Sequence, residues 1–317
     1  MRPPSNDLTR RDALCMGATG VAALMVETDS AAGEAEAKKL PQGFIDAHSH
    51  IWSPDVKRYP LTKGKTKADL APPSFTAEEL LAIAGKHGVG RVVLIQHIGY
   101  HGYDNSYMID MARQHAGRFS IVAAIDENQK RPQDAMRILK KQGVRGFRIR
   151  PEGRGDKWLD SDGMAAMWKC AAEENLAMCT LLNPPELAAV DRMCAKFPET
   201  TVVVDHFGRA SGDKPKELDA LCRLARHENT YVKVSAFYAH DKKQPPYLDL
   251  KPKIQRVLNA FGSERLMWGS DCPYQIEGNH TYAASVALIR DRLDFLTKTD
   301  REWLLRKTAE SVFFKSG

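Results

Sequence analysis

Two histidines lie two positions apart at the end of an apolar run, in the segment Phe-Ile-Asp-Ala-His-Ser-His that begins at Phe44. Side chains at positions i and i+2 of a strand point to the same face, so His48 and His50 would lie side by side. A buried polar group without a partner is energetically costly. The pair must therefore be hydrogen-bonded, bound to a metal ion or catalytic, whereas a single histidine in such a run is most often a satisfied core residue.

Four later apolar runs also end in polar side chains. In chain order these are Arg148 and Arg150, then His206, then Lys233 and Ser235, and finally Asp271. One polar residue at a strand end is ordinary, since it can serve only for capping or solvation. Five such strand ends in one chain indicate a functional site, provided that the fold brings the ends together.

The alternation around Arg148 predicts the direction of its side chain. Phe147 and Ile149 share one apolar face, which sends Arg148 and Arg150 to the opposite face. Two guanidinium groups that converge repel each other unless an anion lies between them, and their planar fork suits a carboxylate or a phosphate. The alternative is that the two arginines pair with Asp46 or Asp271. Either arrangement disfavours a neutral apolar substrate.

Eight apolar runs alternate with helix-patterned segments beyond residue 43. The runs begin near Phe44, Arg91, Phe119, Val144, Ala177, Thr201, Tyr231 and Arg265. The helical segments are 75–87, 105–115, 132–141, 164–174, 186–197, 215–227, 252–261, 283–296 and 301–314. No Gly-x-Gly-x-x-Gly follows the first run, which disfavours a dinucleotide-binding sheet. We predict one α/β domain over residues 38–317, a (β/α)8 TIM barrel whose strand ends carry the active site.

The first 37 residues have the pattern of an export signal. Thr9-Arg10-Arg11-Asp12 precedes 14 apolar residues, 13–26, and Ala35-Glu36-Ala37 offers a cleavage site. This pattern predicts a twin-arginine-type signal peptide over 1–37 and a periplasmic or exported mature protein. The apolar stretch is too short to cross a bilayer, so we expect no membrane span in the mature chain. The alternative is a disordered N-terminus.

Charge and cysteine content limit the possible partners. The formal net charge of +6 comes from basic residues scattered among acidic ones, which argues against nucleic acid as a partner. Removal of residues 1–37 would raise the net charge to about +9, which suits a small anionic organic substrate. No Cys-x-x-Cys pair occurs among the six cysteines, so neither a disulfide framework nor a zinc knuckle is predicted. The oligomeric state stays open.

Several motifs give the chain a recognisable resemblance. Asp-Ala-His-Ser-His at 46–50, Asp-His-Phe-Gly-Arg at 205–209 and Trp-Gly-Ser-Asp-Cys-Pro at 268–273 resemble the amidohydrolase superfamily (amidohydrolase-related, family 2). The segments 101–105, 143–148, 202–209 and 232–235 are similar to its lactonase branch, which includes 2-pyrone-4,6-dicarboxylate lactonase. The resemblance extends from residue 44 almost to the end of the chain.

This resemblance implies roles for individual residues. Asp271 would be the general base, in a polar centre with His48, His50 and His206. Arg148 and Arg154 would bind a substrate carboxylate. The further substrate-binding candidates are Arg150, His101, Arg209, Ser235 and Tyr238. Two sites depart from the branch. Leu181 replaces a polar residue, and Ala239 and His240 stand where an arginine is expected, so recognition of the same dicarboxylate is not expected.

The need for a metal ion is left open by these residues. In one arrangement no metal is obligatory and the histidines and arginines stabilise an oxyanion. In the other, His48, His50 and Asp271, with or without His206, hold one zinc or manganese ion. A binuclear centre is not expected, because the fifth run lacks a histidine and the fourth lacks a bridging lysine or glutamate.

Three functions follow from this site. The first is a hydrolase that opens a lactone of a carboxylated or sugar-acid-like substrate with water activated by Asp271. The second is a metal-dependent decarboxylase of an aromatic or unsaturated acid. The third is a non-catalytic periplasmic anion binder, which we rank last because a carboxylate beside three histidines exceeds what binding requires.

Overall fold

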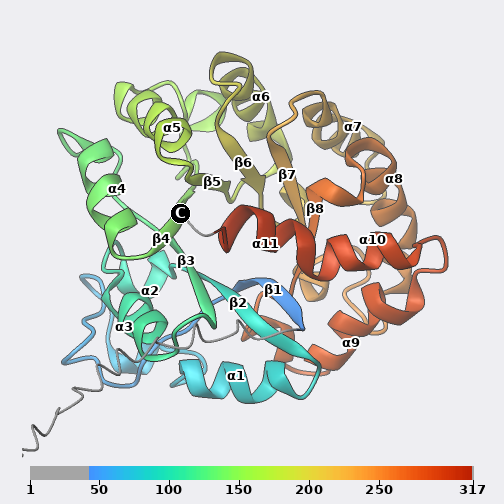
Figure 1. Cartoon of the computed structure of the whole chain (residues 1–317), viewed down its shortest axis with the longest axis horizontal. Coiled ribbons are helices and arrows are strands. Elements are labelled where there is room, and N and C mark those ends of the chain that lie inside the picture. The colour runs from blue at the N-terminus through green and yellow to red at the C-terminus, as the bar shows by residue number, and fades with distance from the viewer. Residues whose placement is uncertain (1–42, 316–317) are drawn as a thin grey trace, which may run out of the picture. The chain divides into compact units, whose positions relative to one another are not determined.

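Eight parallel strands form the centre of the protein. The computed structural model describes residues 43–315, so the predicted export signal at 1–37 lies outside the described part of the chain. The strands are β1 Phe44–Ser49, β2 Val89–Ile95, β3 Phe119–Ala123, β4 Val144–Ile149, β5 Ala177–Thr180, β6 Thr201–Val204, β7 Thr230–Ser235 and β8 Leu266–Gly269. Each pairs in parallel with the next, in the order β1 to β8 (Figure 1). The predicted TIM barrel over this part of the chain is confirmed.

The first and last strands close the barrel. The Asp271 amide donates to the His48 carbonyl at 2.7 Å, and the His50 amide donates to the Cys272 carbonyl at 2.8 Å. Gly269 permits this approach, because a Cβ atom there would lie 2.8 Å from the His48 Cβ. The closure therefore places the histidine pair of β1 directly beside the segment that carries Asp271.

Helices surround the barrel (Figure 1). They are α1 Ala77–Gly85, α2 Ile98–His101, α3 Ser106–Gln114, α4 Pro132–Lys141, α5 Asp162–Glu174, α6 Leu187–Lys196, α7 Pro215–Arg223, α8 Lys251–Phe261, α9 Tyr282–Ala287, α10 Lys298–Glu302 and α11 Thr308–Phe313. Helix α2 was not predicted, because four residues are too short to show a helical period. None of the helices in residues 43–315 is long and apolar enough to cross a membrane.

The two helices predicted at the end of the chain, 283–296 and 301–314, are interrupted. Helix α9 runs into a π-helical turn at Leu288–Arg292, and α10 and α11 are joined by another π-helical turn at Trp303–Lys307. The hydrophobic period continues through such turns, so the pattern alone gives no sign of them.

Helix α11 covers the end of the barrel where the strands begin. Phe313 is 1% exposed and packs with the apolar interior of the barrel, including Ile45 and Val203. Its carbonyl accepts a hydrogen bond from Ser120 Oγ at 2.7 Å, and Glu310 lies 2.6 Å from the guanidinium of Arg91. Access to the barrel interior is therefore left to the opposite end, where the strands finish.

A buried carboxylate holds β1, β8 and α9 together. Asp46 accepts hydrogen bonds from the Ser270 amide at 2.8 Å, the Ser270 hydroxyl at 2.6 Å and the Tyr282 hydroxyl at 2.9 Å. It also accepts from the His48 amide at 3.1 Å. Burial raises the pKa of Asp46, and these hydrogen bonds partly oppose the shift. The network fixes the backbone on both sides of the histidine pair.

Candidate active site

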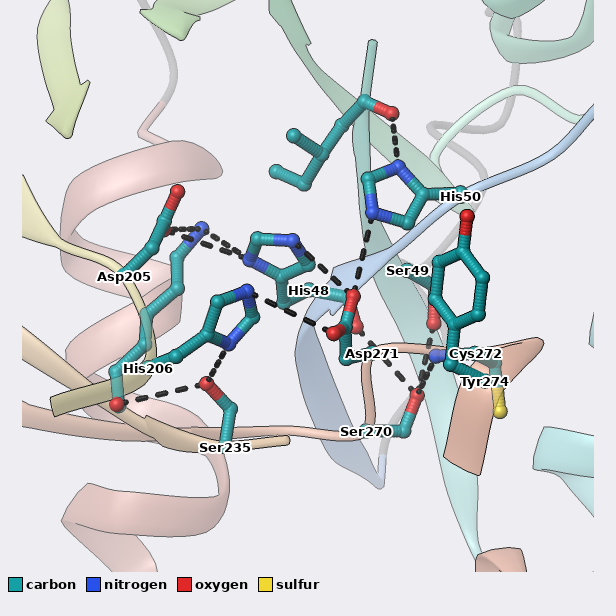
Figure 2. Close-up of polar contacts among 12 residues, drawn as sticks. His48, Ser49, His50, Asp205, His206, Ser235, Ser270, Asp271, Cys272 and Tyr274 are labelled. Carbon is teal, nitrogen blue, oxygen red and sulfur yellow. Dashed lines mark hydrogen bonds and ion pairs between the residues drawn. The ribbon is translucent and has the colours of Figure 1, made fainter. Parts of the chain in front are cut away.

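Three histidines surround one carboxylate where the strands end (Figure 2). Asp271 Oδ1 lies 3.2 Å from His50 Nε2 and 3.5 Å from His48 Nε2. Asp271 Oδ2 lies 3.7 Å from His206 Nε2. All four residues are at most 5% exposed. The structure therefore brings together the four residues that the sequence assigned to the catalytic centre.

The local backbone explains how His206 and Asp271 reach this centre. Both follow the end of a strand by two residues, and both have a left-handed backbone, with φ of 51° at His206 and 66° at Asp271. Residues other than glycine rarely adopt this region, which is often retained where function needs it. Here the sharp turn directs each side chain back over the strand ends and toward His48.

Hydrogen bonds to the far nitrogens set the protonation of two histidines. His50 Nδ1 lies 2.8 Å from the Ile95 carbonyl, which can only accept, so Nδ1 carries the proton. His206 Nδ1 lies 2.8 Å from Ser235 Oγ, whose own hydrogen is directed to the Lys233 carbonyl at 3.4 Å. His50 and His206 consequently direct Nε2 toward Asp271, where this nitrogen can bind a cation or accept a proton.

A buried ion pair lies behind His48. Lys233 Nζ is 3.0 Å from Asp205 Oδ1 and 3.2 Å from His48 Nδ1, and all three residues have zero exposure. Donation from the lysine would leave the proton on Nε2, where His48 serves as a donor beside Asp271. Donation from Nδ1 to Asp205, 3.4 Å away, would free Nε2 as a metal ligand. This pair therefore determines which chemistry His48 can perform.

The environment keeps His48 and His206 neutral and Asp271 ionised. Burial, and then the charge of Lys233, hold the pKa of His48 well below its usual value. Burial lowers the pKa of His206 to about 4, although Asp271 and Asp205 oppose this. For Asp271, burial favours the neutral acid, but its histidine neighbours outweigh burial and hold the pKa well below the ordinary value. At neutral pH the centre is an ionised Asp271 carboxylate beside the neutral imidazoles of His48 and His206.

Tyr238 fixes the orientation of this carboxylate. Its hydroxyl donates to Asp271 Oδ2 at 2.7 Å. Burial and the adjacent Asp271 charge raise the pKa of Tyr238, so the hydroxyl remains protonated and continues to donate. With Oδ2 held by Tyr238, Oδ1 is left without a hydrogen-bond partner among the described residues and can accept a proton.

A cavity of about 540 Å³ opens above the four central residues, and its size suits a small organic molecule. Three arginines reach its wall: Arg148, Arg150 and Arg209. The other lining residues are His50, Gln96, His97, Ile98, Gly99, Leu181, His206, Ala236, Tyr238, Ala239, His240, Asp271 and Tyr274. Tyr238, a substrate-binding candidate from the sequence, lies among them. A positively charged wall above an ionised carboxylate suits an anionic substrate.

The arginines do not pair as the sequence suggested. Arg148 Nε lies 3.8 Å from Asp205 Oδ2, so pairing with Asp46 or Asp271 is wrong. Arg150 follows the end of β4 and donates to Glu152 at 2.9 Å. Both arginines line the cavity, but they differ in burial. Arg148 is 8% exposed, whereas the Arg150 side chain is 39% exposed and lies at the outer rim of the cavity.

Three predicted substrate contacts lie outside the cavity lining. Arg154 is directed to Glu127, with its terminal nitrogen 2.5 Å from the carboxylate. His101 is buried, and its Nδ1 lies 3.1 Å from the Pro60 carbonyl. Ser235 supports His206 from behind. Their positions follow from loop paths and packing that strand periodicity does not determine.

Asp205 is a functional candidate that the sequence reasoning did not single out, although it precedes His206 within a quoted motif. The sequence did contain a signal for Asp205. Lys233 was already marked at the end of β7, and a buried lysine needs a carboxylate partner. Thr180 and Val204, one strand apart, are in register, which brings Asp205 close to the barrel axis.

The residues fit a single divalent ion. Ligand atoms of His48, His206 and Asp271 all lie within 4.8 Å of one another. Two of the atoms, His48 Nε2 and Asp271 Oδ1, are buried without a hydrogen-bond partner among residues 43–315. Imidazole and carboxylate ligands suit zinc or manganese. The sequence had named His48, His50 and Asp271 as the ligands, with or without His206, and the group of ligand atoms contains His206 in place of His50.

A family model for amidohydrolases matches residues 45–315. The chain belongs to the amidohydrolase family, and it is an enzyme of the hydrolase type. This agrees with a barrel that carries two histidines on β1, another after β6 and an aspartate after β8.

Individual relatives make the similarity more specific. The chain is 27% identical to an L-fucono-1,5-lactonase of Burkholderia ambifaria over 244 residues, 74% of this chain and 82% of that protein. It is also 27% identical to a 2-pyrone-4,6-dicarboxylate hydrolase of Comamonas testosteroni over 248 residues, 74% of this chain and 78% of that protein. A solved amidohydrolase from Burkholderia multivorans with bound zinc has a TM-score of 0.72 at 22% identity, covering 86% of this chain and 99% of that one. The last comparison supports the fold.

Proposed function

We propose that this protein hydrolyses the ester bond of a lactone that carries a carboxylate or a sugar-acid-like set of oxygens. The observation that carries the proposal is the ionised Asp271, which lines a cavity together with Arg148 and whose Oδ1 has no hydrogen-bond partner among the described residues. The named activities of the two lactone-hydrolysing relatives support the same reaction type. A carboxylate base below a cationic wall suits attack by water on a bound anionic ester.

The proposed mechanism moves one proton through Asp271. Asp271 Oδ1 accepts a proton from water while the water oxygen forms a bond to the lactone carbonyl carbon. The carbonyl oxygen gains the electron pair and is stabilised by cationic or N–H donors at the cavity wall, where Arg148 is the buried arginine. The carbonyl oxygen then returns this pair to re-form the C=O bond, the ring C–O bond breaks, and the ring oxygen takes the electrons of that bond and the proton held by Asp271, giving an open hydroxy acid.

The supporting residues keep this base ready. Tyr238 donates to Oδ2 and leaves Oδ1 for the water. His50 and His206 are held by Ile95 and Ser235, so their rings cannot turn away. If an ion is bound by His48, His206 and Asp271, it would supply acidification of the attacking water and polarisation of the carbonyl. We propose that this ion is not obligatory, because the ester carbonyl is already electrophilic.

The test combines metal analysis with a substrate panel. Protein purified without added metal or chelator is analysed for zinc and manganese, and sugar-acid and carboxylated lactones are assayed with and without a chelator. Activity that survives in metal-free protein supports Asp271 as the base. Activity lost with the metal contradicts the metal-independent form, and release of CO2 from an aromatic acid would replace the lactonase proposal with a decarboxylase.

The cellular location is a separate proposal. We infer that residues 1–37 direct the folded enzyme through the twin-arginine route, on the strength of Arg10, Arg11 and the Ala35-Glu36-Ala37 site. Replacing both arginines with lysine should retain the full-length precursor in the cytoplasm. A mature form in the periplasm despite the replacement would contradict the proposal.

A further inference from the structure

A second cavity, of about 640 Å³, shares a wall with the active site. Arg209, Ala239 and His240 line both cavities, whereas Lys253 and Asp241 line only the second. His240 is 6% exposed, and its Nε2 is buried without a hydrogen-bond partner among residues 43–315. A polar atom left unpartnered in the wall of a substrate cavity points to a ligand as the missing partner.

The groups behind His240 determine which nitrogen carries its proton. Lys253 Nζ lies 3.4 Å from His240 Nδ1 and 3.1 Å from Asp241 Oδ2. A lysine ammonium can donate but cannot accept, so Nδ1 accepts and the ring hydrogen resides on Nε2. The unpartnered atom is therefore an N–H donor.

The lysine is itself held rigidly in place. Lys253 is 2% exposed, its ammonium is paired with Asp241, and it lies 5.2 Å from the centre of the Phe207 ring. The same ring makes an edge-on contact with His240, with centroids 5.2 Å apart. A chain of contacts therefore runs from the second cavity to the wall of the first, through Asp241, Lys253 and His240 in turn.

Resting on the proposed lactonase function, we propose that His240 Nε2–H donates a hydrogen bond to a neutral oxygen of the substrate, a hydroxyl or carbonyl of a sugar-acid-type lactone. His240 would thus be a specificity-determining residue. One neutral donor compensates poorly for the desolvation of a second carboxylate, but it matches one neutral oxygen well. The anionic group of the substrate is left to Arg148.

The protonation of His240 can be read without any assay of activity. Two-bond 1H–15N spectra of the histidine-labelled protein should show His240 as the Nε2–H form, with its signals assigned by their loss in His240→Gln. In Lys253→Met the stem of the side chain is kept but the donor to Nδ1 is removed, so the signals should move toward a mixture of the two forms. An Nδ1–H form in the wild type would overturn the proposal.

The substrate contact is tested by pairing variants with substrates. His240→Met removes the donor at similar volume, and His240→Gln keeps an amide N–H at similar reach. For a hydroxylated sugar-acid lactone we expect KM to rise about tenfold in His240→Met and less in His240→Gln, as for loss of a neutral hydrogen bond. For the deoxy analogue that lacks the contacted hydroxyl, the change should stay within about twofold, whereas the deoxy analogues that keep this hydroxyl should lose about as much as the parent lactone.

Equal losses on the hydroxylated lactone and every deoxy analogue would overturn the specificity role. If the wild type opens no lactone, the proposed function fails, and calorimetric binding of the open hydroxy acid to wild type and His240→Met replaces the kinetic test. Equal affinities there would overturn the contact, whereas about tenfold weaker binding by His240→Met would support it. Thermal melting of each variant checks that the fold is intact.

Discussion

The fold brings together the four residues of the catalytic centre, which lie at strand ends, but it does not bring together the arginines that follow β4. His48, His50, His206 and Asp271 come from three separate strands or the residues just beyond them, yet they meet within 3.7 Å. Arg150 and Arg154 lie only four residues apart on one loop, yet they are directed to Glu152 and Glu127. Closeness in the barrel thus depends on strand register, and closeness in sequence contributes little once the strand has ended.

The two regions also differ in how deeply their side chains are buried. The centre is backed by the Lys233–Asp205 pair and by the hydrogen bonds of Asp46, all of zero exposure. Arg150 and Arg154 have side chains 39% and 34% exposed, and their ion pairs lie at or near the surface. Exposed pairs contribute little free energy, so the loop can vary while the centre cannot.

The largest effect is expected at the base itself. Asp271→Asn keeps the shape of the side chain but removes the proton acceptor, so kcat should fall by about 10³-fold. The binding of the open hydroxy acid should change much less, as measured by calorimetry. A variant with nearly wild-type kcat would show that the carboxylate of the centre is not the base.

Removal of Lys233, the lysine behind His48, should cause the largest loss of stability. Lys233→Met leaves Asp205 buried without its main partner, which should lower the free energy of unfolding by about 3–5 kcal/mol. The matched control is Lys169→Met, because Lys169 has a side chain 72% exposed and a distant partner. That control should cost less than about 0.5 kcal/mol in urea unfolding. Similar losses in both variants would remove the distinction between centre and surface.

Two arginine variants test this difference between the cavity wall and the loop after β4. Arg148→Met removes a buried cation of the cavity wall, so KM for a carboxylated lactone should rise about 10- to 100-fold, as for loss of a charged hydrogen bond. Arg154→Met removes an arginine held by Glu127 outside the cavity lining, so KM should change less than about threefold. Steady-state kinetics on both variants measure this. A larger effect at Arg154 would mean that the loop rearranges to bind substrate.

These differences explain how far the sequence could be read. The period of two residues places His48 beside His50 and directs Arg148 inward, and eight alternating units predict the barrel. Nothing in the pattern shows that Arg154 is directed to Glu127, because that contact depends on loop conformation. Nor does the pattern show that His101 is covered by the segment containing Pro60. The partner of Arg148 was misjudged because Asp205, directly after β6, was not considered.

The smallest effect concerns a partly buried residue of a loop, His97. Burial lowers the pKa of His97 to about 2, and its Nε2 lies 2.6 Å from the Tyr274 hydroxyl. The unfolded chain, with an ordinary histidine pKa near 6.5, then binds one more proton than the folded chain between about pH 6.5 and 2. The contribution of His97 to unfolding free energy should therefore fall by about 1.4 kcal/mol for each pH unit below 6.5.

His97→Gln does not titrate and isolates this contribution, since the other buried histidines remain in both proteins. Urea unfolding at pH 7, 6 and 5 should show a steeper acid loss of stability in the wild type than in the variant, by about one proton. Parallel curves would mean that water reaches His97 in the folded state. In that case burial, as well as position, would separate the loops from the strand-borne centre.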